Sequence, residues 1–434
     1  MTSAPRSGHA LSLSLVGVGC LIGQALILTR RPLTFELPDS AGYIALGARL
    51  AQQASLGNLF DAYRTPGYPA VLAVISRLQG VAGGDGVVYM QAGLMIATAF
   101  ELYILTFGLT ASRVAATIAA FLFATNVRLL DWERLIMTEA LAIFLVTTLL
   151  LMFWLWVRSH ATRWAILFAA ASAFGILTRP SLAYLPMCLL AVALIGERKR
   201  WLPVLVVLAA IYLPIGGYAL VNDLQYPHAG LSAVSSINLL GKVLEYGMQG
   251  EGDPARFPLL SQGIGALPPG DRDPYHILAA DPTALGSNYG DASAFSSDII
   301  RRHPVEFMGR STADFARQWL LVPYAYVPGG SLQRLSQAMA FFALVTYAAY
   351  PALPLAVIAL ILLWPRLERQ VALGISAVVV AVVGGVATNA LFTYVDFARL
   401  KTPVDALALV AVVAIGSLVV DRAGSALRAR RDVG

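Results

Sequence analysis

Apolar segments long enough to cross a membrane recur along this chain of 434 residues, and they constrain its fold more than any other feature. A helix needs about 20 apolar residues to span the hydrocarbon core of a bilayer. We identify ten such segments, at about residues 10–29, 87–107, 113–127, 135–157, 164–178, 181–195, 201–221, 336–363, 371–392 and 403–420. The sequence therefore predicts an all-α polytopic membrane protein with about ten transmembrane helices.

The overall composition agrees with this prediction. Hydrophobic residues make up 58% of the chain and charged residues 13%, whereas a soluble protein carries about a quarter charged residues. The net charge of +6 does not indicate a nucleic-acid partner, because most basic residues lie in short loops between apolar segments. The first segment lacks a small-residue cleavage site followed by soluble sequence, so we expect it to be retained as a span. Membrane lipids are the predicted surroundings.

Basic residues in short loops indicate which side of the membrane each loop occupies. One side of a ten-span chain collects the following: Arg6, Arg113, Arg158 with Arg163, Arg198 with Lys199 and Arg200, Arg366 with Arg369, and Arg422 with Arg428, Arg430 and Arg431. The positive-inside rule assigns that side to the cytoplasm. Because arginine largely replaces lysine, as is typical of GC-rich bacterial genomes, we expect the bacterial cytoplasmic (inner) membrane, with both termini cytoplasmic.

Two long loops then lie on the outer, periplasmic side, at about residues 30–86 and 222–334. In the first loop, apolar residues at helical spacing over 40–53 predict a helix that lies in the outer membrane interface. Asp39 or Ser40 is the expected N-cap of this helix.

The second loop is the one long polar stretch of the chain. Residues 253–297 are rich in Gly, Pro, Asp and Ser and are expected to be mostly irregular, whereas 295–321 predicts one or two amphipathic helices. We divide the chain into an N-terminal transmembrane module (1–221), a periplasmic loop domain (222–335), and C-terminal transmembrane helices with a cytoplasmic tail (336–434).

Asp39 is the candidate catalytic residue. It follows the first span on the outer side, in the sequence Leu-Pro-Asp-Ser-Ala-Gly-Tyr at 37–43. A carboxylate there can act as a general base that removes a proton from an acceptor hydroxyl or amine, when its surroundings adjust its pKa. The competing interpretation is the N-cap role, which uses the same oxygens. In combination with the basic residues described below, the sequence favours catalysis.

Arg64 lies in the sequence Arg-Thr-Pro-Gly-Tyr-Pro at 64–69, whose two prolines and glycine predict a rigid turn. Such a turn holds Arg64 and Tyr68 at a defined place near the outer surface. Arginine binds phosphate in a bidentate way, and the alternative is contact with lipid headgroups. We assign Arg64 to phosphate binding, and Tyr68 with Tyr43 to the substrate pocket.

Glu139 lies about one turn inside the fourth apolar segment. An ionisable residue in such a place is costly and usually faces a cavity or a partner. Its candidate roles are a second carboxylate, a metal ligand or the partner of an arginine. We place Glu139 in the substrate pocket.

Five basic residues lie on the side where the positive-inside rule predicts few: Arg64, Arg128, Arg179, Lys242 and Arg399. Each alone is compatible with a position at the lipid surface. Together they indicate an anion, for which a lipid-linked phosphate or diphosphate at the outer leaflet is the natural candidate. The sequence contains no Walker A, dinucleotide-binding, HExxH or GxSxG motif, and no cytoplasmic loop is long enough for a nucleotide-sugar domain.

The order of these features resembles the membrane-embedded GT-C glycosyltransferases that use polyprenyl-phosphate sugars. That group contains the lipid A aminoarabinose transferase and the dolichol-phosphate-mannose protein mannosyltransferases. The resemblance covers about the first 220 residues and the last 40, and it lies in order and topology rather than in one motif. Its features are Asp39, the turn at 64–69, Thr138-Glu139-Ala140-Leu141, Leu177-Thr178-Arg179-Pro180 and Asp396-Phe397-Ala398-Arg399.

The resemblance implies an inverting transfer of a sugar from polyprenyl phosphate to an envelope glycan, a glycolipid or a protein on the periplasmic side. It implies that Asp39 is the catalytic base and that the five outer cations bind the donor phosphate. Members often carry a paired acidic residue in the first outer loop. Here Ser40 follows Asp39, so the pair is absent, and a divalent cation, Mg²⁺ or Mn²⁺, is left open.

Two other functions stay open beside this one. A flippase or another transporter of a lipid-linked saccharide would line a path through the membrane with its charges, often in paired halves. The chain shows no repeat between its halves, and its charges gather at the outer face. A transferase similar to O-antigen ligase would use a diphosphate-linked glycan and rely on Arg and His chemistry in 222–334.

Overall fold

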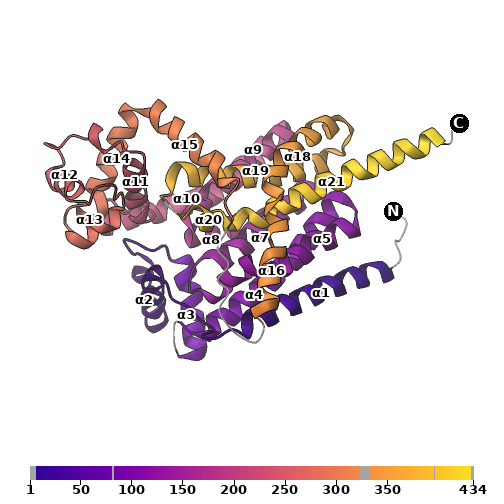
Figure 1. Cartoon of the computed structure of the whole chain (residues 1–434), viewed down its shortest axis with the longest axis horizontal. Helices are drawn as coiled ribbons and strands as arrows, with labels where there is room; N and C mark the ends of the chain where they lie inside the picture. The colour runs from indigo at the N-terminus through magenta and orange to yellow at the C-terminus, as the bar shows by residue number, and fades with distance from the viewer. Residues whose placement is uncertain (1–5, 81–82, 323–332, 395, 432–434) are drawn as a thin grey trace.

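Helices dominate the computed structural model, which describes residues 6–80, 83–322, 333–394 and 396–431 (Figure 1). Within these ranges the one β-type pairing is an isolated bridge between Phe35 and Leu135. A chain in a bilayer has to pair its backbone N–H and C=O groups internally, and a helix does so within a single segment. The predicted all-α fold class is confirmed.

Seven helical segments of the described chain are long and apolar enough to cross a membrane. They correspond to α1 (Arg6–Leu28), α4 (Asp85–Thr110), α7 (Glu139–Ser159), α10 (Trp201–Gln225), α18 (Ala349–Leu363), α19 (Arg369–Phe392) and α21 (Thr402–Arg431). The pair Arg113–Ala124 and Val127–Arg134, which is bent by 47° at its break, makes an eighth when its halves count as one span. Two shorter apolar helices, Thr162–Thr178 and Pro180–Gly196, coincide with the predicted fifth and sixth segments. Helices thus occupy all the predicted segments, and the chain is a multi-pass membrane protein.

α7 lies in the middle of the helix bundle, where it packs against α4, α21 and α8. Its apolar window is 78% buried, the largest share among the spans. The remaining helices of the bundle are α5 (Arg113–Ala124), α6 (Val127–Leu130), α8 (Thr162–Thr178), α9 (Tyr184–Gly196), α16 (Gln333–Phe342), α17 (Leu344–Tyr347) and α20 (Phe397–Leu400). α1 and α21 both point their terminal ends toward the same end of the bundle (Figure 1).

α2 (Pro38–Gln52) and α3 (Gly67–Gln79) form a helical pair at the other end of the bundle (Figure 1). Gly47 lies where the two helices meet, and a Cβ added to it would come within 2.8 Å of the Leu72 Cβ. The absence of a side chain therefore allows close packing of α2 on α3. The helix predicted over 40–53 is confirmed.

The N-cap of α2 is Leu37, so the expectation of Asp39 or Ser40 was wrong. Ser40 is the third residue of the helix, where its Oγ accepts a hydrogen bond from the Leu37 N–H at 2.9 Å. Pro38 occupies the first helical position, where its fixed φ suits a helix and its missing N–H costs nothing. The Asp39 carboxylate consequently makes no capping bond and is available to side chains.

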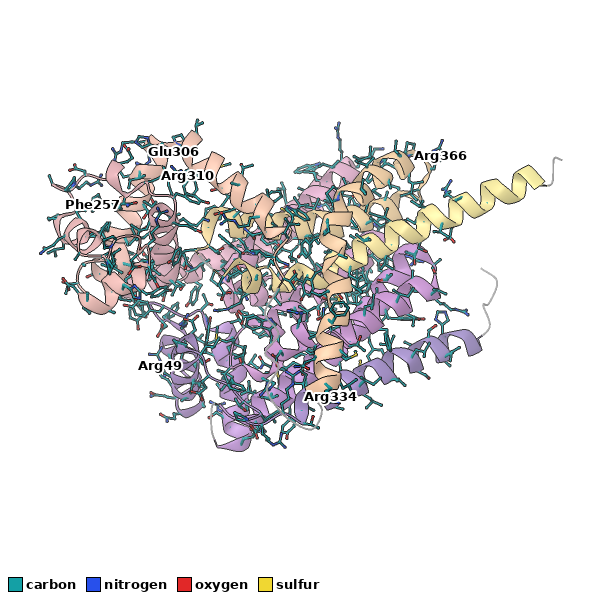
Figure 2. All side chains as sticks on the ribbon, viewed as in Figure 1. Arg49, Phe257, Glu306, Arg310, Arg334 and Arg366 are labelled. Carbon is teal, nitrogen blue, oxygen red and sulfur yellow. The ribbon has the colours of Figure 1, made fainter. Side chains whose placement is uncertain are left out.

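Residues after α10 fold into a helical region, here called the loop region, beside α2 at the same end of the bundle (Figure 1). Its helices are α11 (Val234–Glu245), α12 (Pro258–Gly265), α13 (Pro274–Ala280), α14 (Gly290–Arg302) and α15 (Pro304–Gln318). They enclose their own apolar core, in which Ile237, Leu240, Phe295 and Ile299 are almost completely buried. The ion pair between Arg310 and Glu306 lies on its outer surface, far from Arg366 at the opposite end of the molecule (Figure 2).

The expectation that 253–297 is mostly irregular was wrong, because α12, α13 and the first half of α14 lie within it. Two of the prolines that suggested loops, Pro258 and Pro274, begin helices instead. Proline lacks a backbone N–H, which costs nothing at the first helical position but removes a hydrogen bond at later positions. The helices predicted over 295–321 are present as parts of α14 and α15.

Candidate functional site

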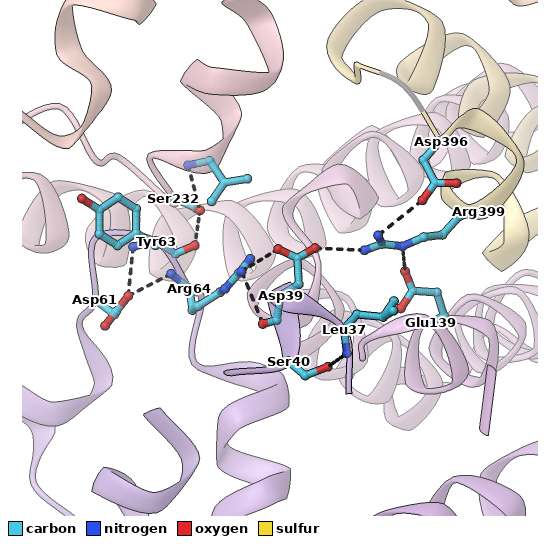
Figure 3. Close-up of polar contacts among 11 residues, drawn as sticks. Leu37, Asp39, Ser40, Asp61, Tyr63, Arg64, Glu139, Ser232, Asp396 and Arg399 are labelled. Atoms are coloured by element: carbon cyan, nitrogen blue, oxygen red, sulfur yellow. Dashed lines mark hydrogen bonds and ion pairs between the residues drawn. The ribbon is translucent and has the colours of Figure 1, made fainter. Parts of the chain in front are cut away.

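Asp39 lies in the first turn of α2, at the edge of a cavity of about 530 Å³ between α2 and the loop region. Its side chain is 40% exposed and has two arginine partners. One oxygen faces Arg64 and the other faces Arg399 (Figure 3). Asp39 is thus both ion-paired and within reach of a molecule in the cavity.

The turn that carries Arg64 is held from two sides. Asp61 Oδ1 accepts hydrogen bonds from the backbone N–H groups of Tyr63 at 2.9 Å and Arg64 at 3.0 Å. Gly67 begins α3 against the end of α8, where an added Cβ would lie 2.5 Å from Thr178 Oγ1 and 2.6 Å from its backbone N. No larger residue fits there without a shift of backbone. The rigid turn expected from the sequence is present, and it docks beside Arg179.

Arg64 contacts both an acid and an aromatic ring. Its Nη2 donates to Asp39 Oδ1 at 2.8 Å, and its guanidinium carbon lies 4.6 Å from the centre of the Tyr43 ring. The Tyr43 ring meets the Tyr68 ring edge to face at 5.4 Å. Tyr68 is completely buried, and its hydroxyl donates to Gln91 Oε1 at 3.3 Å. Tyr43 therefore orients the ion pair directly, whereas Tyr68 supports Tyr43 from within the core.

Arg399 of α20 connects three carboxylates that come from distant parts of the chain (Figure 3). Its Nε donates to Glu139 Oε1 at 2.7 Å, its Nη1 to Asp396 Oδ2 at 3.4 Å, and its Nη2 to Asp39 Oδ2 at 3.4 Å. Of these three contacts, the one with Asp39 joins the residues that lie farthest apart in the sequence, 360 positions from each other. Arg399 consequently couples the first loop to the last span.

Glu139 is completely buried at the N-terminus of α7. Its Oε1 also lies 3.3 Å from Arg179 Nη1, so two arginines share this one oxygen. Its Oε2 has no hydrogen-bond partner in the described structure. Among the three roles considered for Glu139, the geometry matches the partner of an arginine.

Six ion-paired side chains form what we call the Asp39 cluster: Asp39, Glu139, Asp396, Arg64, Arg179 and Arg399. Its three carboxylates balance the charge of its three guanidinium groups. Burial by itself would raise the pKa of Asp39, but the Arg64 guanidinium, and then that of Arg399, lower it below its ordinary value of 3.8. Asp39 is therefore ionised at neutral pH.

The residues of the cluster do not fit a divalent cation. Each of its three carboxylates already contacts at least one guanidinium group, and a metal ion would have to approach those positive charges. Among the described residues, no group of three or more His, Cys, Asp or Glu side chains is arranged to hold a metal.

Two of the five predicted cations lie elsewhere. Arg128 Nε donates to the Ala340 carbonyl of α16 at 3.1 Å. The Lys242 side chain is completely buried, with its Nζ in contact with Asp314 and 3.3 Å from Glu245 Oε2. The structure thus brings Arg64, Arg179 and Arg399 together and places Arg128 and Lys242 outside the Asp39 cluster.

The cavity has lining residues that the sequence did not single out. It is lined by Asp39, Gly42, Ala45, Leu46, Arg49, Asp61, Tyr63, Arg64, Val234, Ile237, Tyr275 and Tyr289. The spacing of Asp39, Gly42 and Arg49 on one helix was a signal that could have pointed to Arg49. Nothing in the sequence near Tyr275 or Tyr289 indicated that the loop region returns to α2.

A family comparison matches residues 63–219 to the dolichyl-phosphate-mannose-protein mannosyltransferase family. The matched stretch contains Arg64, Glu139 and Arg179, and it leaves out Asp39 and Arg399. A comparison with curated proteins found no match.

Among solved structures, the Archaeoglobus fulgidus oligosaccharyltransferase tethered to an acceptor peptide is similar with a TM-score of 0.51 at 12% identity, over 95% of this chain and 50% of that one. This chain therefore spans about half the length of that protein. ArnT from Cupriavidus metallidurans bound to undecaprenyl phosphate is matched with a TM-score of 0.38 at 15% identity, over 92% of this chain and 78% of that one.

The family match covers residues 63–219, and the match to the oligosaccharyltransferase structure extends the same fold over most of the chain. The chain is accordingly an all-α membrane protein with a GT-C-type fold, similar over residues 63–219 to the dolichyl-phosphate-mannose-protein mannosyltransferases.

Proposed function

We propose that this protein is an inverting glycosyltransferase that moves a sugar from a polyprenyl-phosphate donor to an acceptor on the periplasmic side of the bacterial inner membrane. The acceptor is an envelope glycan, a glycolipid or a protein. The observation that carries the proposal is the position of Asp39. This carboxylate is exposed at a cavity and contacts two arginines, one in the turn before α3 and one in α20.

In the proposed step, an acceptor hydroxyl or amine attacks the anomeric carbon of the donor sugar. The bond between that carbon and the phosphate oxygen breaks, and polyprenyl phosphate leaves with the electron pair. Asp39 takes the proton from the acceptor. Attack from the face opposite to the leaving group inverts the anomeric configuration. The protein thus supplies position, a base and charge stabilisation.

Arg64, Arg179 and Arg399 are the proposed phosphate-binding residues. All three are paired with carboxylates, so a phosphate has to compete with Asp39 and Glu139 for them. The contact between Arg399 and Asp39 is long, at 3.4 Å, so a donor phosphate would break it more easily than the 2.8 Å contact between Arg64 and Asp39. Removing a cation from Asp39 raises its pKa, because burial then acts against the charged form. Donor binding would in this way make Asp39 a better base.

The test uses the purified protein in detergent, a panel of polyprenyl-phosphate sugars and a membrane extract as the source of acceptor. Mass spectrometry follows the release of free polyprenyl phosphate. We expect release by the parent protein and a loss of about 10²–10⁴-fold in rate for Asp39→Asn, which is the range for removal of a general base.

Asp298→Asn is the matched control, because Asp298 also pairs with an arginine at 2.8 Å but lies on α14. It should release polyprenyl phosphate at the parental rate. Absence of release from every donor would overturn the proposal and favour a diphosphate-linked donor or a transporter. Near-parental release by Asp39→Asn would overturn the assignment of the base alone.

A further inference from the structure

The cavity beside Asp39 is a groove along one face of α2. Asp39, Gly42, Ala45 and Arg49 line it at helical spacing, with Asp39 at one end and Arg49 at the other. Ten helical positions at 1.5 Å each make the groove about 15 Å long. Between these charged ends, Gly42 has no side chain, Ala45 has a small one, and the buried Leu46 also lines the groove. The Arg64 side chain lies over Gly42, 2.9 Å from where a Cβ would be.

Three tyrosines form much of the wall that faces α2. Tyr63 and Tyr275 are 41% and 42% exposed, and the centre of the Tyr289 ring lies 5.2 Å from the centre of the Tyr63 ring. They come from the turn before α3, from α13 and from the segment before α14. A tyrosine presents an apolar ring face together with a hydroxyl, which suits a ligand whose rings have apolar faces and polar edges. Sugar rings have this character.

Arg49 at the far end of the groove has spare hydrogen-bonding capacity. Its Nη2 lies 3.2 Å from the Phe60 carbonyl and 3.4 Å from Asp61 Oδ2, and its Nε is buried without a partner. The other oxygen of Asp61 is occupied by the backbone of the Arg64 turn. A guanidinium group carries five donors, and the printed contacts of Arg49 within the described residues use Nη2, so its Nη1 donors are open to an anion in the groove.

We propose that this groove binds the acceptor, and that the acceptor is a saccharide with a phosphate or carboxylate group that Arg49 holds. The inference rests on the proposed function, because it takes Asp39 as the end of the groove where the acceptor reacts. A chain of a few sugar rings fits the length of the groove, with its rings against the tyrosines. Arg49 is here a specificity-determining residue that lies about 15 Å from the base.

A binding measurement tests the inference without any turnover. Saturation-transfer difference NMR on the full chain in detergent would use glucose 6-phosphate, glucuronic acid and glucose as probes, with inorganic phosphate, which has no carbon-bound proton to observe, as a competitor. A short acidic peptide serves as the non-saccharide probe. We expect glucose 6-phosphate or glucuronic acid to bind best, and Arg49→Gln to weaken that binding at least about fivefold, as loss of a charge-assisted hydrogen bond does.

Arg310→Gln is the matched control, because Arg310 is also an exposed, ion-paired arginine but lies on the outer surface of the loop region. It should bind the probes as the parent does. Arg49→Lys keeps the charge and should bind better than Arg49→Gln, and the thermal midpoint of each variant checks its folding. Equal binding by the parent and Arg49→Gln, or binding of the peptide alone, would overturn the inference.

Turnover separates this inference from the proposed function. With donor and extract, Arg49→Gln should raise the KM for acceptor while the KM for donor stays near the parental value. If the parent releases no polyprenyl phosphate from any donor, the proposed function fails, whatever the binding result. If the parent turns over and Arg49→Gln leaves the KM for acceptor unchanged, the groove assignment fails and the proposed function stands.

Discussion

Arg399 and Lys401 lie two positions apart in the chain, yet they belong to two different charge clusters. Arg399 reaches Asp39, whose side chain is 40% exposed at the cavity. Lys401 reaches Asp405 at 2.9 Å, and both of these side chains are completely buried. Tyr350 closes the second cluster, because its hydroxyl donates to Asp405 at 2.6 Å and its ring lies 4.1 Å from the Lys401 ammonium.

The difference between the two clusters is one of access. A ligand in the cavity can take over an arginine of the Asp39 cluster, because one end of that cluster is open. Nothing can take over Lys401 without opening the bundle. Similar ion pairs therefore behave differently: in the closed pair, loss of one partner leaves the other buried without a counter-charge, whereas the open cluster can exchange partners during a reaction.

The largest expected effect comes from breaking the closed pair. Lys401→Met leaves Asp405 buried without a cation, which should cost about 3–5 kcal/mol of stability. That cost corresponds to roughly 10²–10⁴-fold in the ratio of folded to unfolded protein. Denaturant unfolding in detergent measures it. The double variant Lys401→Met/Asp405→Leu should recover most of the loss of stability. If Lys401→Met alone were as stable as the parent, the Lys401–Asp405 pair would not be the closed cluster described here.

Breaking the open cluster should affect turnover more than stability. Arg399→Gln removes a charged hydrogen-bond donor from the proposed phosphate site, which should lower kcat/KM for the donor about 10–100-fold. Its loss of stability should be smaller than that of Lys401→Met, since Glu139 keeps Arg179 as a partner. Kinetics and unfolding of the two variants side by side check this, with Arg310→Gln as the control. If Arg399→Gln lost much stability and kept normal kinetics, Arg399 would have a structural role, and the distinction between the two clusters would be wrong.

The pH dependence sharpens the assignment of Asp39. Its pKa is lowered in the folded protein, so the ionised form persists as the pH falls, and the acid limb of kcat/KM should lie below the ordinary carboxyl pKa of 3.8. Arg64→Gln removes a cation and leaves burial, so the pKa rises and the acid limb should move to higher pH. A pH profile of each protein measures the limb. A limb that stays in place would show that Asp39 is not the titrating group.

The smallest expected effect is that of a chelator. Because every carboxylate of the Asp39 cluster contacts an arginine, removal of divalent cations with EDTA should change the rate less than about twofold. Turnover before and after dialysis against EDTA, with Mg²⁺ or Mn²⁺ added back, measures this. A loss that metal restores would mean that the arginines leave their carboxylates in the active state.

Much of the fold could be predicted from apolar length and helical spacing, which are local properties. The predicted spans and the helix over 40–53 depend on residues within one segment. The predicted N-cap of that helix was wrong because Ser40 lies inside the helix, where its Oγ accepts a hydrogen bond from the Leu37 N–H. Residue preferences alone do not distinguish a serine in this position from a serine at the N-cap. The helices within 253–297 were missed because proline both begins and breaks helices.

The site could be predicted only in part. Sequence reasoning named Asp39, Arg64, Glu139, Arg179 and Arg399, which the structure brings into one cluster. The same reasoning applied equally to Lys242, because a basic residue in an outer loop has the same appearance whether it faces a cavity or a buried acid. Arg49 and Tyr275 were missed because the groove exists only where α2 meets the loop region.

By itself, the sequence determined that this chain crosses a membrane many times as helices, because each apolar segment has to satisfy its own backbone in lipid. It also determined which ionisable residues stand out against that apolar background. Only the tertiary structure decided which of those residues are partners, which are closed in and which face the groove. Ion pairs form over a few ångströms between segments up to 360 positions apart, and no local pattern in the chain encodes that distance.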